Sequence, residues 1–318
     1  MAQLRRSGAK LHVTPMRRSV GPWDALDGWK LKRQLDRLGR FDVIHSHSSK
    51  AGVLARVFGA RRGTTQVYSP HGFYTMTGSA PSYVGLIERV LSLASDRIVA
   101  VSQFERQHAI SLGIAPARVT VIPNGLPPST PLSRAEARAR LGLDPDAFIL
   151  GFVGRLEAQK DPLAAIAVML DLRDEPVELA VIGDGGLRGE AEAAAVAAGA
   201  RVRFLGALEA KPMFGAFDAL LCTSRYEGMP LAFLESLNAG VPIISFPVGG
   251  TDELIDEGWT GMVVQPGVAR AVQAVRNMLA YSGEERRAIA EACRAKAALH
   301  SDKTMGDATL ALYTSLRA

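Results

Sequence analysis

The sequence predicts an α/β protein with two doubly wound parallel sheets, on three observations. Short β-branched runs alternate with longer helical patterns along the whole chain, which is typical of βαβ units. The length of 318 residues corresponds to two domains of about 150 residues each. A stretch with three prolines and one glycine, residues 124–131, separates two sets of such runs and is typical of an interdomain hinge.

The β-branched runs give the expected strands in order. In the first half they are residues 10–15, 41–45, 65–69, 97–102 and 119–122. In the second half they are residues 148–153, 177–182, 202–205, 219–223, 242–246 and 261–264, which make a complete doubly wound sheet. The pattern is helical from Val268 onward and ends in an amphipathic helix at 303–316. We expect domains at 1–126 and 134–300, a hinge at 127–133, and a C-terminal helix at 301–318 that crosses back to the first domain.

The composition excludes several classes of protein. Hydrophobic residues make up 47% and charged residues 22% of the chain, as in globular proteins, so a disordered or fibrous chain does not fit. No apolar run reaches the roughly 18 residues of a membrane-spanning helix, and no signal-peptide core follows the basic start, so we expect a cytoplasmic protein. Cys222 and Cys293 form no Cys-x-x-Cys motif and are interpreted as buried apolar residues.

The net charge of +5 is concentrated at the start of the chain. Residues 1–40 hold ten Lys and Arg against three Asp, a local excess of seven positive charges. No aromatic-interleaved basic stripe accompanies it, so we exclude nucleic acid as a partner. The basic segment, with Trp23 and Trp29, favours peripheral docking on an anionic membrane surface, and ordinary solvated surface is the alternative.

A pair of glutamates follows one apolar strand of the second half. Glu227 and Glu235 lie eight positions apart, and Pro230 between them is well suited to begin a helix. Glu227 then falls in the loop and Glu235 on the second helical turn, so both can face one pocket. The free N–H groups at such a helix start favour a diphosphate. A surface loop and a solvated helix face are the alternative.

Two further groups follow other strands. Gly154 and Arg155 precede Lys160, and two cations five positions apart can neutralise a diphosphate leaving group without a metal. Salt bridges to Glu157 or Asp161 are the alternative. Gly183-Asp184-Gly185 ends another strand, where glycine allows close backbone approach to a base or ribose. The spacing does not fit a nicotinamide-binding fingerprint.

These motifs resemble one family, the retaining glycosyltransferases of GT-B fold, and within it glycosyltransferase family 4. The resemblance covers nearly the whole chain. It rests on Pro123-Asn124-Gly125, Gly154-Arg155-Leu156 with Lys160, Gly183-Asp184-Gly185, Phe204-Leu205-Gly206, Glu227-x7-Glu235, Ala239-Gly240-Val241-Pro242, and Gly249-Gly250 before Glu253. The string from His45 to Gly52 and Pro70-His71-Gly72-Phe73 resemble the branch that builds bacterial exopolysaccharide, capsule or lipopolysaccharide.

The resemblance implies a role for each matching residue. Arg155 and Lys160 would hold the donor diphosphate, and Glu235 the ribose. Glu227, with the backbone of Gly228, Met229, Pro230 and Leu231, would hold the donor sugar. Gly183 and Asp184 would belong to the same donor site. His71 would contact the sugar and stabilise charge near the anomeric carbon. The catalytic set is thus Glu227, His71, Arg155 and Lys160.

The implied activity is metal-independent hexosyl transfer with retention. The donor would be a UDP- or GDP-linked sugar, with no other cofactor. The acceptor would be a glycan or a polyprenyl-diphosphate-linked saccharide in bacterial surface polysaccharide biosynthesis. The family normally begins with a strand and a glycine-rich loop that are not found here, so we expect a first domain that lacks its opening strands. A catalytically silent nucleotide-binding fragment or assembly subunit is the alternative, and an isomerase of the same fold is a third.

Lesser signals have structural interpretations. His45-x-His47 lacks a third ligand, so no metal site is expected. Asp144-Pro145-Asp146 is interpreted as a turn. Ser102 and Glu105 form a capping box that begins a helix. Phe104 and Phe148 are expected in the core, and Lys50 meets either an acceptor phosphate or solvent.

Overall fold

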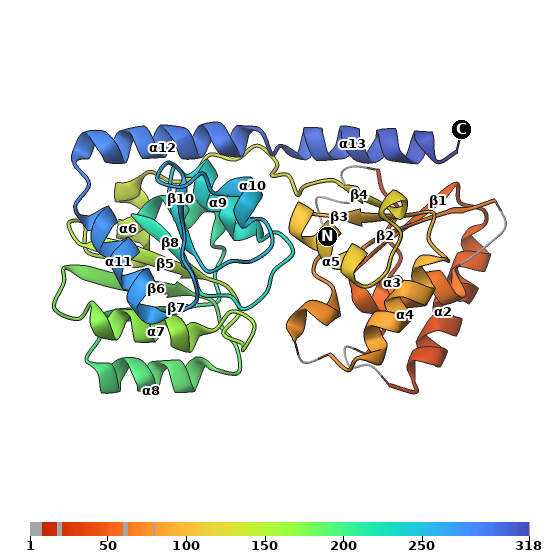
Figure 1. Ribbon diagram of the computed structural model, residues 1–318, viewed down its shortest axis with the longest axis horizontal. Coiled ribbons are helices and arrows are strands. Elements are labelled where there is room, and N and C mark those ends of the chain that lie inside the picture. The colour runs from red at the N-terminus through yellow and green to blue at the C-terminus, as the bar shows by residue number, and fades with distance from the viewer. Residues whose placement is uncertain (1–7, 18–20, 60–62, 79, 318) are drawn as a thin grey trace.

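In the computed structural model, which describes residues 8–17, 21–59, 63–78 and 80–317, the chain forms two α/β domains (Figure 1). The described part of the first domain contains a four-stranded sheet in the order β1-β2-β3-β4, with every pair parallel. Its elements are α2 (Asp24–Leu38), β1 (Val43–His47), α3 (Ser49–Phe58), β2 (Thr65–Ser69), η1 (Tyr74–Thr77), α4 (Tyr83–Ser92), β3 (Arg97–Ala100), α5 (Gln103–Ser111), η2 (Pro116–Arg118) and β4 (Val119–Val121). The predicted α/β class is confirmed.

The second domain contains a six-stranded parallel sheet in the order β10-β9-β8-β5-β6-β7. Its elements are α6 (Arg134–Leu141), β5 (Phe148–Val153), α7 (Pro162–Asp171), β6 (Val177–Ile182), α8 (Arg188–Ala198), β7 (Val202–Gly206), η3 (Lys211–Ala216), β8 (Ala219–Cys222), α9 (Leu231–Asn238), β9 (Ile243–Ser245), α10 (Thr251–Leu254), β10 (Gly261–Val263), α11 (Val268–Leu279) and α12 (Gly283–Ala298). The strand order reverses at β5. A crevice therefore forms beyond the carboxyl ends of β5 and β8, where doubly wound sheets bind ligands.

Helices cover both faces of the second sheet because its strands are apolar on both sides. In β5, Ile149 packs into the hydrophobic cluster on one face, while Leu150 and Phe152 pack into the cluster on the other. Both cysteines lie in the core as predicted, and both belong to the first of these clusters. This two-sided burial is typical of parallel sheets.

The last two helices run in line along one side of both domains (Figure 1). Helix α12 packs on α9 of the second domain. Helix α13 (Asp302–Ser315) packs against the first sheet, where Leu312 joins Val67, Val99 and Ile122 in one cluster. Helices α2, α3 and α4 lie on the other side of that sheet (Figure 1). No helix among the described residues combines the length and apolar content needed to cross a bilayer.

Two predictions about the first domain are wrong. Residues 10–15 form no strand. An extended segment becomes a strand only by pairing, and within the described residues β1 pairs with β2 alone. Phe104 is 45% exposed, because α5 turns the face with Glu105 and Ala109 toward the core instead. Phe148 is buried as predicted.

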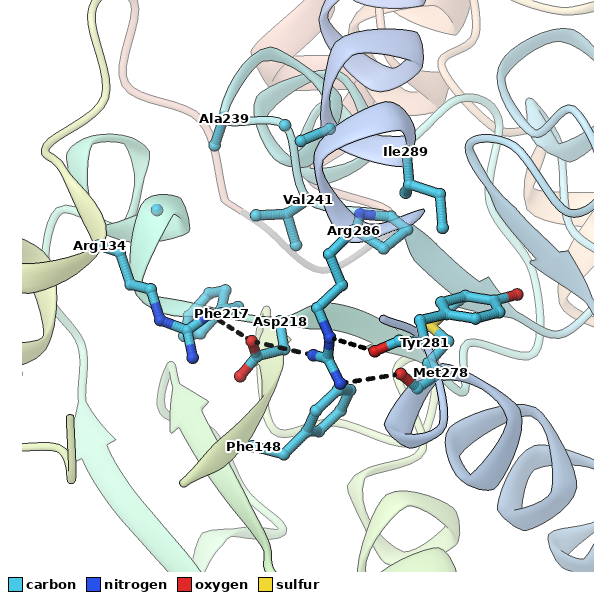
Figure 2. A pocket seen from close by; sticks show the side chains of 14 residues that line it. Arg134, Phe148, Phe217, Asp218, Ala239, Val241, Met278, Tyr281, Arg286 and Ile289 are labelled. Carbon is cyan, nitrogen blue, oxygen red and sulfur yellow. Dashed lines mark hydrogen bonds and ion pairs between the residues drawn. The ribbon is translucent and has the colours of Figure 1, made fainter. Parts of the chain in front are cut away.

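A buried ion pair anchors the amino-terminal edge of the second sheet. Arg138 and Asp218 have side chains only 2% and 3% exposed, and their ion pair measures 2.7 Å. Arg138 also donates to the backbone carbonyls of Ala216, Asp144, Pro145 and Ala147. The predicted turn at Asp144 is thereby tied to the core. Asp218 further contacts Arg134 and Arg286 beside a cavity of about 170 Å³ (Figure 2).

A second buried carboxylate ties together two loops of the first domain. Glu105 is fully buried, and it accepts hydrogen bonds from the N–H of Val101 at 2.7 Å and of Gly72 at 2.5 Å. Ser102 caps α5 as predicted, accepting from the Glu105 N–H, but the Glu105 side chain does not close the capping box. Burial raises the pKa of Glu105 to about 7, against the lowering effect of the two hydrogen bonds.

We predict that Asp218→Asn lowers the free energy of unfolding by about 3 to 5 kcal/mol, because it removes the negative charge that compensates the buried charge of Arg138. The matched control is Arg134→Gln, which removes a half-exposed partner of the same carboxylate and is expected to cost about 1 kcal/mol or less. Urea unfolding of the three proteins measures this difference. Equal losses of unfolding free energy in both variants would show that the buried pair stabilises the fold no more than the half-exposed one does.

A second prediction concerns the pH dependence of stability. Because the pKa of Glu105 rises from its ordinary 4.5 to about 7 on folding, the folded protein holds an extra proton between these values. Stability contributed at this site is therefore lost as the pH rises through that window, by a few kcal/mol at most at about 1.4 kcal/mol per pKa unit. Between pH 5 and pH 8, the melting temperature of wild type should fall relative to that of Glu105→Gln. A constant difference across this range would contradict the prediction.

Candidate active site

The carboxyl ends of β5 and β6 approach each other without side chains between them. Gly154 and Gly183 both have positive φ angles, of 156° and 147°. A Cβ atom on Gly183 would lie 1.8 Å from the carbonyl oxygen of Gly154. Only glycine fits this contact, so the backbones at the ends of β5 and β6 pack directly on each other beside the crevice.

Two of the predicted residues, one from each side of the crevice, form an ion pair. Lys160 Nζ lies 2.8 Å from Glu227 Oε1, and the two side chains are 18% and 11% exposed. The alternative partners are engaged elsewhere: Asp161 pairs with Arg225, and Glu157 accepts from the N–H of Gly186. The structure thus brings the strand-end cation and the loop glutamate together in one partly buried site.

Arg155 lies at the exposed rim of the same crevice. Its guanidinium donates to the side chain of Gln159 at 3.1 Å, and Gln159 donates to the carbonyl of Tyr226 at 3.2 Å. Gln159 therefore links the loop after β5 to the loop after β8. Its role was not apparent from the sequence, because a single glutamine carries no motif.

Helix α9 begins at Leu231, one residue later than predicted, with Pro230 as its N-cap. Glu235 lies on its second turn as expected. Its carboxylate makes no hydrogen bond or ion pair with the residues that the structure describes. Burial raises the pKa of Glu235, and the nearby charge of Lys211 opposes this shift. A half-buried carboxylate of this kind favours a ligand that donates hydrogen bonds to it.

The loop before α9 carries the contact between the domains. A Cβ on Gly228 would lie 2.9 Å from the N atom of Gly72 in the first domain. Ser102 Oγ donates to the Gly228 carbonyl at 2.8 Å, and Asn124 Nδ2 donates to the Met229 carbonyl at 3.0 Å. Ser102 and Asn124 are therefore interdomain residues, which their interpretation as a cap and a hinge motif did not indicate. Leu231, the next predicted site residue, is half-exposed.

The predicted Gly183-Asp184 pair ends β6 on the same edge of the sheet. Asp184 is exposed, accepts from the N–H of Gly185 at 2.8 Å and pairs with Arg188 at 3.3 Å. It makes no contact with Lys160, Glu227 or Glu235 among the described interactions.

His71 faces this site from the first domain. It follows β2 with a φ angle of 54°, unusual for a residue other than glycine, and the next residue, Gly72, has a φ angle of 98°. Glu105 holds the Gly72 N–H and so fixes this turn. Burial lowers the pKa of His71, and the neighbouring His47 lowers it further.

A cavity of about 630 Å³ lies between the domains and touches both His71 and Glu227. Its volume falls in the usual range for small-molecule sites. Tyr226 and Gln159 line it from the second domain. The first domain contributes mainly apolar side chains, which include Val53, Phe73, Tyr74, Val84 and Ile87. Lys50 lies at the wall but is paired with Asp24 at 2.6 Å, so it is not simply solvated.

Metal ligands do not gather in the part of the chain that the structure describes. No group of three or more His, Cys, Asp or Glu side chains there is placed to hold a metal ion. His45 and His47 instead stack on each other, with ring centroids 4.3 Å apart.

Comparisons with known proteins identify the family and the fold. The family model described as Glycosyltransferase Family 4 matches residues 3–130, and the model described as Glycosyl transferases group 1 matches residues 133–296, about half of the chain. A D-inositol 3-phosphate glycosyltransferase of Actinosynnema mirum is 34% identical over 258 residues, 71% of this chain and 61% of the relative. The UDP-Gal:alpha-D-GlcNAc-diphosphoundecaprenol alpha-1,3-galactosyltransferase of Escherichia coli is 28% identical, over 71% of this chain and 63% of the relative. The chain thus spans less than two thirds of the length of these relatives.

Solved structures share the fold. The Anabaena protein HepE, crystallised with UDP and glucose, superposes with a TM-score of 0.85 at 20% identity, over 99% of this chain and 88% of that one. Sucrose-phosphate synthase from Thermosynechococcus elongatus gives a TM-score of 0.83 at 19% identity, over 93% of this chain and 79% of that one. The two facing parallel-sheet domains are therefore the GT-B arrangement, and the chain belongs to the group 1 glycosyl transferases, with an N-terminal part that matches glycosyltransferase family 4.

Proposed function

We propose that this protein transfers a sugar from a nucleotide sugar to a lipid-linked glycan acceptor, with retention of anomeric configuration. The observation that carries the proposal is the pairing of Lys160 with Glu227 at the switch point of the second sheet, beside Arg155 and α9 and facing His71 across the cavity. Cations and a helix start favour the binding of a departing diphosphate. A carboxylate and an imidazole offer hydrogen bonds to the hydroxyl groups of a sugar.

In this proposal the residues divide the donor between them. Arg155 and Lys160 bind the diphosphate, and Glu235 accepts hydrogen bonds from the ribose hydroxyls. Glu227 and the backbone of Gly228 to Leu231 bind the sugar hydroxyls. Gly183 and Asp184, at the carboxyl end of β6, border the nucleotide.

The proposed reaction exchanges one bond at the anomeric carbon for another. The bond to the diphosphate oxygen breaks, and the acceptor oxygen bonds to the same face of the sugar. The acceptor proton passes to the departing phosphate oxygen. Lys160, Arg155 and the N–H groups at the start of α9 stabilise the charge that develops on this oxygen, which is a role that fixed dipoles and cations perform well in a partly buried site. This reaction needs no metal ion.

A lipid-linked acceptor is supported by the apolar surface that adjoins the cavity. Tyr83 and Ile87 of α4 line the cavity and are also exposed, and Leu86, Val90 and Leu93 extend the same apolar surface away from it. The E. coli relative is named for a diphosphoundecaprenol acceptor. We propose that this α4 surface, made of these five residues, rests on the bilayer that carries the acceptor, with the saccharide in the cavity and bacterial surface polysaccharide as the product.

The basic segment supports an anionic membrane surface as well. Helix α2 exposes Trp29, over whose ring Arg33 lies at 4.5 Å, together with Lys30 and Arg37. Trp23 is half-buried beneath Arg17 and is a weaker candidate. Arg5, Arg6 and Arg18 lie outside the described residues. Aromatic and basic side chains of this kind bind anionic head groups.

The first test is nucleotide binding by the second domain. At 100 times its dissociation constant, UDP or GDP should raise the melting temperature by roughly 2 to 4 °C. Arg155→Ala and Glu235→Ala should each weaken this binding by about tenfold to a hundredfold, since each loses a hydrogen bond to a charged group. Arg173→Ala changes an exposed arginine two residues beyond the carboxyl end of α7; it is the matched control and should bind as wild type does.

Transfer itself separates the proposal from its rival. The donor for this assay is a labelled sugar linked to whichever nucleotide binds. The label should appear on a polyprenyl-diphosphate saccharide even when EDTA is present. Proton NMR of the product should show the same anomeric configuration as in the donor. Nucleotide binding with no transfer to any acceptor would favour the alternative, a catalytically silent nucleotide-binding or assembly subunit. Unchanged nucleotide affinity in both variants would place the donor elsewhere.

We also predict that the α4 surface binds membranes. The double variant Leu86→Glu with Val90→Glu should lower co-sedimentation with phosphatidylglycerol vesicles by about tenfold or more, because two apolar side chains no longer enter the lipid. Val196→Glu, at an 82% exposed apolar position on α8, is the control and should sediment as wild type does. Equal sedimentation of wild type and the double variant would remove α4 from the contact.

A further inference from the structure

His71 is held by a chain of aromatic side chains that reaches back to the C-terminal helix. His47 Nδ1 lies 2.9 Å from His71 Nε2, and the two rings are nearly parallel, at 19°. His47 stacks in turn on His45. Both ring nitrogens of His45 are hydrogen-bonded. Nδ1 lies 2.5 Å from Tyr313 Oη, and Nε2 lies 2.8 Å from Ser69 Oγ. Tyr313 belongs to α13, 268 residues further along the chain.

Strand pairing explains why these side chains meet. In the parallel register of β1 with β2, His47 lies opposite Ser69, and His71 follows two residues later. His45 and His47 are two positions apart on β1, so they point to the same face of the sheet. Helix α13 covers that region of the first domain through Leu312 and Met305. The imidazoles therefore form a stack between the inner face of α13 and the interdomain cavity.

The hydrogen bond between His47 and His71 determines which nitrogen of His71 carries the proton. Of the two facing nitrogens, one must carry the proton and the other the lone pair. Because His47 occupies Nε2 of His71, only Nδ1 of that ring remains for a ligand, and it makes no hydrogen bond with the described residues. The tautomer of His47 thus decides whether His71 Nδ1 is a donor or an acceptor.

We propose that His47 is a positioning residue that fixes the orientation and tautomer of His71, and that Tyr313 and Ser69 hold it in place through His45. This inference rests on the proposed function, in which His71 touches the donor sugar. The lowered pKa of His45, about 4, and of His47 and His71 keeps the stack neutral at physiological pH, which a tautomer-specific role requires.

The decisive comparison separates the hydrogen bond from the ring contact at residue 47. His47→Phe keeps an aromatic ring but has no nitrogen, whereas His47→Asn places an amide near the position of Nδ1. We expect His47→Phe to lower kcat by about tenfold to a hundredfold, the usual cost of a misplaced reacting group, with the affinity for the nucleotide unchanged. We expect His47→Asn to recover most of that loss.

Tyr313→Phe tests the far end of the chain. It removes only the hydroxyl that contacts His45, and it should lower kcat by about threefold to tenfold, the rate equivalent of one neutral hydrogen bond. Tyr281→Phe in the second domain is the matched control and should leave kcat unchanged. Melting temperatures of all variants show whether each is folded at the assay temperature.

A spectroscopic readout makes the test independent of sugar transfer. The chain has six histidines, and long-range proton–nitrogen NMR of ¹⁵N-histidine-labelled protein reports the tautomer of each ring. The His71 signal is assigned by its loss in His71→Asn. Wild type should show one tautomer for His71, and His47→Phe should show a mixture, whereas His12→Asn, at an exposed position, should leave it unchanged.

The two readouts keep the inference separate from the proposed function. If wild type transfers sugar and His47→Phe keeps its kcat within about twofold, the positioning role is overturned while the function stands. If His71 shows the same tautomer signal in wild type and in His47→Phe, the role is overturned whether or not transfer occurs. If wild type transfers no sugar but His71 loses its single tautomer in His47→Phe, the orientation is confirmed and the proposed function fails.

Discussion

The close backbone contact at Gly228 is the constraint on which the interdomain site depends. A side chain there would collide with the N atom of Gly72, and a Cβ on Gly249 would lie 2.2 Å from the Gly228 carbonyl oxygen. Three glycine backbones therefore meet where the two domains touch. Ser102 and Asn124 complete the contact with hydrogen bonds to the carbonyls of Gly228 and Met229. With backbone so close, the loops before α9 and after β2 face each other directly, and their polar groups share one cavity.

This contact links the charge distribution of the site to its geometry. Glu227 precedes Gly228, and its pairing with Lys160 joins the loops after β8 and β5. On the other side, Glu105 holds the Gly72 N–H while it remains buried and hard to ionise. A buried carboxylate is costly unless it is hydrogen-bonded. Here the buried Glu105 carboxylate fixes the turn at His71, whose positive φ angle is strained. Strained backbone of this kind is found most often at functional sites.

The C-terminal segment joins the two domains a second time. Helix α12 packs on the second domain, while α13 returns to the first sheet and places Tyr313 against His45. Residues distant in sequence thereby support the loop after β2 that carries His71. The first domain supplies most of the cavity lining, including most of its apolar side chains, and the second domain supplies the ion pair of Lys160 with Glu227. Both domains are therefore needed to form the site.

Local patterns in the sequence were sufficient to determine the strands at 65–69, 148–153 and 177–182, the switch-point glycines, and the helix that carries Glu235, because strand periodicity and turn chemistry depend on neighbours in the chain. They also placed Arg155, Lys160 and Glu227 at strand ends. Tertiary structure alone decided that Lys160 pairs with Glu227 rather than with Asp161, that Phe104 is exposed while Glu105 is buried, that residues 10–15 form no strand, and that Tyr313 reaches His45. The reason is physical: pairing, burial and the choice of hydrogen-bond partner depend on which distant segments are brought together, and a local pattern holds no information about that.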